Sequence, residues 1–438
     1  MIIIKSPYKK IIDIIGFQKY NPNITYRPLL FNLDIKVEEE TLLYNVFSGM
    51  LVLSNKSIET FELLVKYWYY VPTEFDDIGF ANKVRQLLIE KEKINGITTY
   101  TIFPTTNCNA RCSYCFEIGR RKYNMTFNTA LKVADYITTQ SKGAKVVLRW
   151  FGGEPLLNVN SINLICSNLK KNKIDFESKM ATNGFLFDKQ LVMTIKNIWN
   201  LSQVQITIDG TRDYYNKIKQ YRTSTDAFSR VLSNIQLLTE SHIKVVIRLN
   251  VSEENSEELI SLVNNDLIPK FRGNRYVLIY SHLLNTQLAG DTDKLRETLK
   301  QKNILDDIIY TSGFSCQNLT PTSPKVYRCI ADDRRSVTIL PNGKIGLCEH
   351  YTEEKFISDI ETPEIINEDV VKELRNNLVD FDICEKCAYY PRCIKLKCCP
   401  EANFCNLDIM AHHIDRLKKE ILGEYSSWKF KVQSEKGE

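Results

Sequence analysis

The sequence predicts an α/β fold built around a parallel β-sheet. Between residues 99 and 282, short apolar strands alternate with segments whose apolar residues recur at helical spacing. We expect strands at 99–104, 145–150, 179–182, 204–208, 244–251 and 275–281, and helices at 128–139, 161–171, 189–199, 227–239 and 256–263. Repeated β/α units of this length place their strands in parallel. The functional residues of such folds lie at the carboxyl ends of the strands.

Composition narrows the class of protein. The 438 residues are 43% hydrophobic, enough for a large core in about two or three domains. The formal net charge is +5 and no run of Lys and Arg is present, so we expect no nucleic-acid partner. No apolar run approaches the ~18 residues of a membrane span, and residues 1–5 are too short for a signal peptide. The 13 cysteines therefore predict metal binding in the reducing cytoplasm rather than disulfides.

Residues 1–95 precede the β/α units and form a small domain of their own. We expect a strand at 26–34, a hairpin at 41–47 and 50–54, and two helices that begin near Ser57 and Asp76. This order of elements matches a winged-helix-like shape. It lacks a basic recognition helix, so DNA binding is not expected, and the module could also be a packing extension without a ligand.

Three cysteines form the central motif of the chain. Cys108, Cys112 and Cys115 lie in a C-x3-C-x2-C spacing directly after the first expected strand. Thiolates are soft ligands that favour iron–sulfur clusters, zinc or copper(I). Three close cysteines with no local fourth suit a four-iron cluster that keeps one iron open. A structural zinc knuckle or free buried thiols are the alternatives.

This spacing, with an aromatic residue before the last cysteine, resembles the radical S-adenosylmethionine (radical SAM) superfamily. The resemblance implies that the open iron binds the amino and carboxylate groups of SAM. It also implies that the reduced cluster cleaves SAM to a 5′-deoxyadenosyl radical. The six β/α units resemble the partial (β/α)6 TIM-like barrel of that superfamily, here over residues 96–284.

Polar residues and glycines at the expected strand ends carry the resemblance further. Gly152-Gly153-Glu154 follows the second strand and resembles the family motif that contacts the SAM amino group. The strand-end residues that the resemblance assigns to SAM binding are Asn183, Thr207, Arg248 and Asn250. Singly, each could instead be a turn or cap residue, and Asp209-Gly210 is most simply a strand-to-loop turn.

A polar linker over 285–324 leads to a cysteine-rich C-terminal region, 325–438. Its hairpin around Pro341-Asn342-Gly343 and its C-x2-C-x5-C run resemble the SPASM domain, which carries two auxiliary four-iron clusters. The family pattern assigns the distal cluster to Cys384, Cys387, Cys393 and Cys405, and the proximal cluster to Cys329, Cys348, one of Cys398 or Cys399, and as a possible fourth ligand Cys316. If Cys316 is idle, the open iron could bind a substrate thiolate. Two zinc ribbons are the competing interpretation, and Cys166 is expected in the core.

The resemblance implies an enzyme with SAM and three [4Fe-4S] clusters. It is closest to radical SAM maturases of ribosomally made peptides (RiPPs), whose N-terminal module binds the leader of the precursor peptide as an added strand. The expected reaction is a thioether or carbon–carbon crosslink, with flavodoxin or ferredoxin as reductant. Glu349 follows Cys348 at the place of the proposed base of sulfatase-maturing enzymes, so it is a candidate general base or else a solvated loop carboxylate. The alternatives are oxidation of Cys or Ser to formylglycine and a non-catalytic iron–sulfur or zinc protein.

Overall fold

The computed structural model describes most of the chain. It covers residues 2–54, 58–92, 95–284, 291–314, 327, 329–350, 355–375, 382–393, 399 and 404–436. The chain divides into two compact units. Residues 1–93, 319–328 and 378–438 form one, which we call the sheet unit, and residues 94–318 and 329–377 form the other, which we call the barrel unit.

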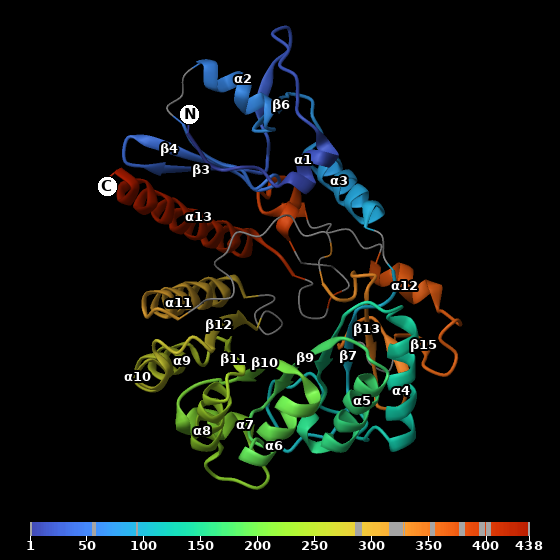
Figure 1. Ribbon diagram of the computed structural model, residues 1–438. Helices are drawn as coiled ribbons and strands as arrows, with labels where there is room; N and C mark the ends of the chain where they lie inside the picture. Colours follow the sequence, from blue (N-terminus) through green and yellow to red (C-terminus); the bar gives the residue numbers. More distant parts are fainter. Residues whose placement is uncertain are drawn as a thin grey trace. The chain divides into compact units, whose positions relative to one another are not determined.

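The barrel unit is built on one nine-stranded sheet (Figure 1). In spatial order its strands are β12 (Val277–Leu283), β11 (Lys244–Val251), β10 (Leu201–Thr207), β9 (Phe176–Thr182), β8 (Val146–Trp150), β7 (Thr99–Ile102), β13 (Ser336–Ile339), β14 (Lys344–Gly346) and β15 (Phe356–Asp359). Neighbouring strands from β12 to β13 run parallel, and β14 and β15 are antiparallel. The predicted parallel sheet is confirmed, and each expected strand from 99 to 281 is present within a few residues.

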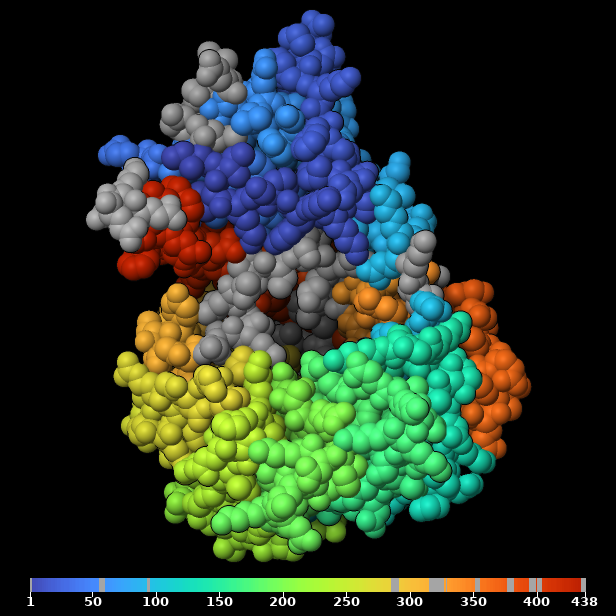
Figure 2. All heavy atoms as spheres, in the orientation of Figure 1, coloured from blue at the N-terminus to red at the C-terminus, as the bar shows by residue number. Residues whose placement is uncertain are grey.

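Helices between the parallel strands cover the outside of the sheet, and one more helix of this unit follows β15 (Figure 1). They are α4 (Phe127–Gln140), α5 (Val159–Lys171), α6 (Lys189–Thr194), α7 (Arg212–Lys219), α8 (Ala227–Glu240), α9 (Ser256–Leu262), α10 (Ile268–Phe271), α11 (Thr292–Thr311) and α12 (Glu368–Arg375). The side chains of Thr126 and Asp226 cap α4 and α8 by accepting backbone N–H groups, as the sequence favours. Residues of the barrel unit, coloured from teal through green to yellow, make up its surface on the face in view (Figure 2). The short helix α7 was not expected from the sequence.

The parallel register brings the carboxyl ends of neighbouring strands to one edge of the sheet. Ile102 pairs with Trp150, Trp150 with Met180, Ile206 with Thr182, and Thr207 with Arg248. Trp150 is 1% exposed and Ile206 is fully buried, so these two side chains belong to the core. Polar side chains that follow the strands are therefore gathered at the edge where the chemistry is expected.

The sheet unit contains a four-stranded antiparallel sheet in the order β1-β5-β4-β3. Its elements are β1 (Ile2–Lys5), α1 (Lys9–Ile15), β2 (Tyr26–Pro28), β3 (Asn32–Val37), β4 (Glu40–Asn45), β5 (Leu51–Ser54), α2 (Ile58–Lys66), β6 (Tyr70–Pro72), α3 (Asp77–Lys91) and α13 (Leu407–Lys436). The strand expected at 26–34 is divided, because β2 pairs with β6 while β3 pairs with β4. β3 stands at one edge of the four-stranded sheet.

Parts of the C-terminal region pack within the sheet unit. On α13, Glu424 forms an ion pair with Lys5 at 2.8 Å, and Lys429 forms one with Glu38 at 2.8 Å. The Tyr390 hydroxyl donates a hydrogen bond to the Asn82 side chain at 2.8 Å. The compact units thus separate residues 329–377 from residues 378–438, and a single domain over 325–438 stays a prediction. Among the described helices, none is both long and apolar enough to cross a membrane.

Candidate cofactor site at the strand ends

Cys108, Cys112 and Cys115 lie together in the loop that follows β7. Burial raises the pKa of the Cys108 thiol to about 12, and the nearby charges of Cys112 and Cys115 add to that increase. Burial also raises the pKa of Cys115. The Cys108 sulfur accepts the backbone N–H of Ala110 at 3.4 Å. Three neighbouring cysteine sulfurs are suited to iron, because a bound metal supplies the positive charge that favours the thiolate form.

The Gly152-Gly153-Glu154 turn packs directly against the base of this loop. The Gly153 N–H donates a hydrogen bond to the Thr105 carbonyl at 3.2 Å, and the Glu154 N–H donates to the Asn107 carbonyl at 2.7 Å. Gly152 has a φ of +112°, and a Cβ there would lie 2.4 Å from the Thr105 oxygen. A Cβ on Gly153 would lie 2.2 Å from the Asn107 oxygen. Both glycines are therefore required by the close approach of two backbones.

The Glu154 carboxylate points into the protein and is fully buried. It accepts hydrogen bonds from the Leu156 N–H at 3.1 Å, the Thr182 hydroxyl at 2.8 Å and the Asn183 N–H at 2.9 Å. Burial raises its pKa to about 7, and these hydrogen bonds limit the increase. The side chain thus joins the ends of β8 and β9. The structure favours the backbone carbonyls of this turn over the carboxylate as the groups that face a cationic amine.

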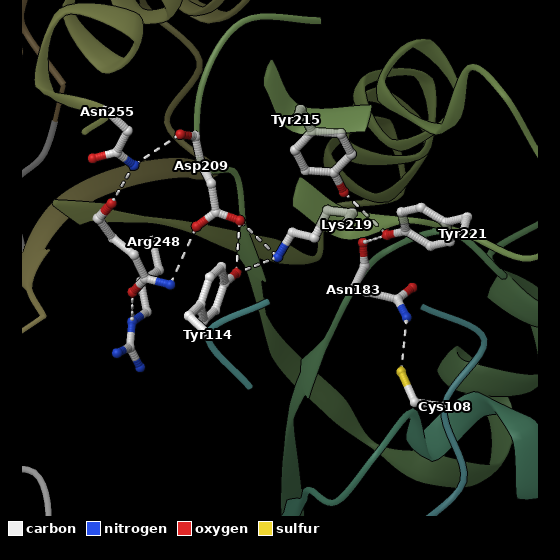
Figure 3. Close-up of polar contacts among 10 residues, drawn as sticks. Cys108, Tyr114, Asn183, Asp209, Tyr215, Lys219, Tyr221, Arg248 and Asn255 are labelled. Atoms are coloured by element: carbon white, nitrogen blue, oxygen red, sulfur yellow. Dashed lines mark hydrogen bonds and ion pairs between the residues drawn. The ribbon is translucent and has the colours of Figure 1, made fainter. Parts of the chain in front are cut away.

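Asn183 links β9 to the cysteine loop. Its side-chain amide donates a hydrogen bond to the Asn109 side chain at 2.7 Å and lies 3.9 Å from the Cys108 sulfur (Figure 3). Its backbone carbonyl accepts the hydroxyl of Tyr221 at 3.2 Å. Asn183 therefore links the end of β9 to the cysteine loop, in addition to any role in the turn after that strand.

The other three predicted strand-end residues lie on β10 and β11. Thr207 and Arg248 are half-buried partners in the parallel ladder. The Arg248 guanidinium donates to the Asn250 side-chain oxygen at 2.7 Å, and the Asn250 amide donates to Asp209 at 3.3 Å. Asn250 is 4% exposed. Its amide therefore orients Asp209, whereas Thr207 and Arg248 keep partly accessible side chains.

Sequence reasoning missed a buried network behind the cysteine loop. Asp209, which was expected only to form a turn, makes an ion pair with Lys219 at 2.8 Å. Both groups also hydrogen bond to the hydroxyl of Tyr114, which lies between Cys112 and Cys115 (Figure 3). Only a weak indication of this network was present in the sequence. Tyr114 is an aromatic residue within the cysteine motif, and Lys219 is one lysine within a polar stretch.

The segment that carries Glu349 contacts the cysteine loop. The Arg120 guanidinium donates hydrogen bonds to the Glu349 carbonyl at 3.3 Å and the His350 carbonyl at 2.5 Å. The same guanidinium lies 5.1 Å from the centre of the Phe116 ring, and the His350 ring lies 4.3 Å from that ring. The Glu349 Oε2 atom is buried and has no hydrogen-bond partner among the described residues. The backbone at Glu349 and His350 is thus held against the cysteine loop.

Four C-terminal cysteines form a second group, in the sheet unit. The charges of Cys393, Cys405 and Cys384 add to burial in raising the pKa of Cys387 to about 12, so the four sulfurs are neighbours. Cys329 and Cys348 belong to the barrel unit, and Cys399 belongs to the sheet unit. Cys316 and Cys398 lie outside the described residues. Cys166 is fully buried on α5, as expected for a core residue.

The described part of the chain has no three His, Cys, Asp or Glu side chains grouped around the position of one metal ion. A four-iron cluster is bound differently, because each thiolate binds its own iron and the sulfurs surround a larger volume. The three loop cysteines, with the close backbone turn beside them, fit a group of that kind.

Comparison with known families agrees with this geometry. Residues 102–264 match the family model described as the radical SAM superfamily. The protein is an enzyme with a radical SAM domain. This superfamily uses SAM with an iron–sulfur cluster, and the matched residues contain the cysteine loop, the Gly152-Gly153 turn and the strand ends of β9 to β11.

Several curated proteins are similar to this radical SAM enzyme over part of its length. Fe-coproporphyrin III synthase of Methanosarcina barkeri is 26% identical over 49% of the chain, which spans 53% of that relative. GTP 3′,8-cyclase of Clostridium perfringens is 25% identical, over 61% of the chain and 87% of its own length. A cysteine-type anaerobic sulfatase-maturating enzyme of Clostridium novyi is 22% identical, over 66% of the chain and 84% of its own length.

Solved structures share the fold. anSMEcpe with bound AdoMet aligns at a TM-score of 0.60 and 15% identity, over 76% of this chain and 99% of that chain. Streptococcus suis SuiB bound to S-adenosylmethionine aligns at 0.50 and 14% identity, over 90% and 100%. SuiB bound to its precursor peptide SuiA also aligns at 0.50, with 13% identity over 88% and 100%. The predicted fold class is confirmed by these likenesses and by the parallel sheet.

Proposed function

We propose that this radical SAM enzyme is a peptide maturase that installs a thioether or carbon–carbon crosslink in a ribosomally made precursor. The observation that carries the proposal is the separate N-terminal sheet with an edge strand, β3, in the same chain as the radical SAM barrel. An edge strand presents unpaired backbone groups to which an extended peptide can add. SuiB, which shares the fold, has been solved with a precursor peptide.

The shape of β3 supports peptide addition. Glu38 and Glu39 form a two-residue turn, so Val37 and Glu40 are the hydrogen-bonded pair that closes the hairpin. Pairs alternate along an antiparallel ladder. The backbone N–H and C=O groups of Lys36 therefore point away from β4, toward the edge. A hollow of about 670 Å³, lined in part by Leu30 and Phe75, lies in the same unit and offers room for a side chain.

In the barrel unit, Cys108, Cys112 and Cys115 would hold a [4Fe-4S] cluster, and the Gly152 to Glu154 turn would face the SAM amino group. When bound, this cluster and SAM supply a deoxyadenosyl radical able to break an unactivated C–H bond. The four neighbouring sulfurs in the sheet unit, those of Cys384, Cys387, Cys393 and Cys405, would hold a second, distal cluster. Cys329 and Cys348 would hold a third, with Cys399 or Cys398, and Cys316 as a possible fourth ligand. Flavodoxin or ferredoxin would supply the electron.

Glu349 would accept the proton that leaves the substrate after hydrogen abstraction. Its buried, unpartnered oxygen and its contact with the cysteine loop through Arg120 support this role. The same residue favours the second candidate, a sulfatase-type maturase that oxidises Cys or Ser to formylglycine. The sequence likeness to the Clostridium novyi enzyme also favours that candidate.

The test is anaerobic reconstitution with iron, sulfide, SAM and a low-potential reductant, using short peptides encoded beside the gene. A crosslinking maturase yields a peptide that has lost a pair of hydrogens and carries no aldehyde. A product that reacts with hydrazide reagents would instead establish formylglycine formation. Cys112→Ala should abolish 5′-deoxyadenosine formation while the iron bound by the C-terminal cysteines remains. Wild-type levels of 5′-deoxyadenosine from that variant would refute the cluster assignment.

A further inference from the structure

A buried ion pair lies behind the cysteine loop. Asp209 follows β10, Lys219 ends α7, and their charged atoms are 2.8 Å apart. The side chains are 2% and 4% exposed. Removing two charges from water is costly, and their mutual attraction often only offsets that cost. A gain in stability is therefore a weak explanation for the burial of this ion pair.

Both charged groups reach the cysteine loop through one hydroxyl. Tyr114 donates a hydrogen bond to Asp209 at 2.6 Å and accepts one from the Lys219 ammonium at 2.6 Å (Figure 3). Lys219 also acts through its backbone, because its carbonyl accepts the N–H of Arg111 at 2.8 Å. Arg111 and Tyr114 stand on the two sides of Cys112. Lys219 thus holds the loop at two points, with the cysteine between them.

The carboxylate partner is fixed from other elements. The Asn250 side chain on β11 donates to one Asp209 oxygen at 3.3 Å, while the other oxygen faces Tyr114 and Lys219. The Asn255 amide donates to the Asp209 carbonyl at 2.9 Å. The ion pair therefore has one defined arrangement.

The ammonium also carries its charge close to Cys112. Burial by itself would lower the pKa of Lys219, but the negative charges of Asp209 and Cys112 outweigh it and keep that pKa well above the usual value. The Tyr215 ring lies 5.7 Å from the ammonium on another side. These groups keep Lys219 charged and in place behind the cysteine loop.

We propose that Lys219 is a positioning residue for the iron–sulfur cluster, which clamps the loop on both sides of Cys112 and places a fixed positive charge against the Tyr114 hydroxyl of that loop. The inference rests on the proposed assignment of that cluster to Cys108, Cys112 and Cys115. One-electron reduction, by a low-potential donor of the ferredoxin or flavodoxin class, adds a negative charge to the cluster. A nearby ammonium stabilises that reduced state and raises the reduction potential.

Substitutions of Lys219 and of Asp209 should then shift the reduction potential of the cluster in opposite directions. Lys219→Met removes positive charge and should move the midpoint potential of the SAM-responsive cluster to a more negative value. Asp209→Asn removes negative charge, keeps a hydrogen-bonding side chain and should move that potential to a less negative value. Lys219→Arg keeps the charge and should restore a potential close to that of the wild type. A role in folding alone would move the first two variants in the same direction.

The experiment is an EPR-monitored redox titration of the full-length, reconstituted protein, in which added SAM identifies the signal of its own cluster. The matched control is Lys302→Met, because Lys302 is itself buried and forms an ion pair with the partly buried Asp306 at 2.7 Å within α11. This control should leave the potential unchanged. If Lys219→Met binds too little iron to titrate, Lys219→Gln is measured instead, with iron release to a chelator as a second readout. We expect a several-fold faster release that Lys219→Arg reverses.

An unchanged potential and unchanged iron release in the Lys219 variants would overturn the proposal, as would the same shift in Lys302→Met. A wrong assignment of the cluster to Cys108, Cys112 and Cys115 would give a different experimental result. In that case Cys112→Ala keeps the SAM-responsive EPR signal, whatever the Lys219 variants do.

Discussion

The backbone N–H of Glu154 donates a hydrogen bond to the carbonyl oxygen of Asn107 over 2.7 Å. Asn107 directly precedes Cys108, so the turn after β8 and the start of the cysteine loop behave as one rigid piece. Any group bound by the loop is thereby placed against the backbone of the glycine turn. This close contact makes the turn sensitive to added atoms.

Gly153→Ala should disrupt the contact between the glycine turn and the start of the cysteine loop. The new Cβ would lie 2.2 Å from the Asn107 oxygen, a backbone atom that cannot move without moving the loop. We expect a loss of about 1–3 kcal/mol in the free energy of unfolding and a clear loss of SAM binding by calorimetry. Gly143→Ala is the control, because its φ of +81° adds strain while nothing lies within 4 Å of the new atom. Normal SAM binding by Gly153→Ala would contradict the expected contact.

The Glu154 carboxyl should make stability depend on pH. Its pKa is raised from 4.5 to about 7 by burial. Between these values the unfolded chain loses the proton that the folded chain keeps, so this contribution is full below the lower pKa and is lost as the pH rises to about 7. Relative to Glu154→Gln, the wild-type protein should lose roughly 3 kcal/mol over that range. Urea denaturation at steps from pH 4 to pH 8 measures it, and a wild-type protein that gained stability relative to Glu154→Gln as the pH rose would contradict the prediction.

Arg120→Ala should separate product formation from SAM cleavage. The guanidinium holds the carbonyls of Glu349 and His350 against the cysteine loop, so its loss frees the candidate base without touching a cluster ligand. Product formation should fall on the order of tenfold to hundredfold, while 5′-deoxyadenosine formation without substrate stays near the wild-type level. The exposed neighbour Arg121 provides the control, as Arg121→Ala. Equal losses of product in both variants would argue against a specific role of Arg120.

Lys36→Pro should weaken binding of the precursor peptide. Proline removes an N–H that points to the free edge of β3, while the ladder with β4 stays intact. Lys36→Ala keeps that N–H and removes only the side chain. Fluorescence anisotropy with a labelled precursor should report weaker binding for proline and near-normal binding for alanine. If the two variants bind alike, strand addition at β3 is not the mode of recognition.

The strong local patterns were predictable. The β/α alternation from residue 99 to 282, the cysteine loop and the Gly152-Gly153 turn each occupy one short stretch, and the parallel sheet placed them as expected. The winged-helix-like elements of the N-terminal domain were recognised in outline, although β1 and the division between β2 and β3 were not. Short strands at sheet edges carry too few residues for a clear pattern.

The sequence by itself determined which residues bear the chemistry, because ligand spacing and strand-end glycines are properties of neighbouring residues. Only the tertiary structure decided which distant residues contact and support them. Tyr114 meets Asp209 and Lys219 across 95 and 105 positions of the chain, and α13 joins the N-terminal sheet rather than the residues 329–377. Such contacts follow from burial and from how elements pack in space, and no local pattern of residue types encodes them.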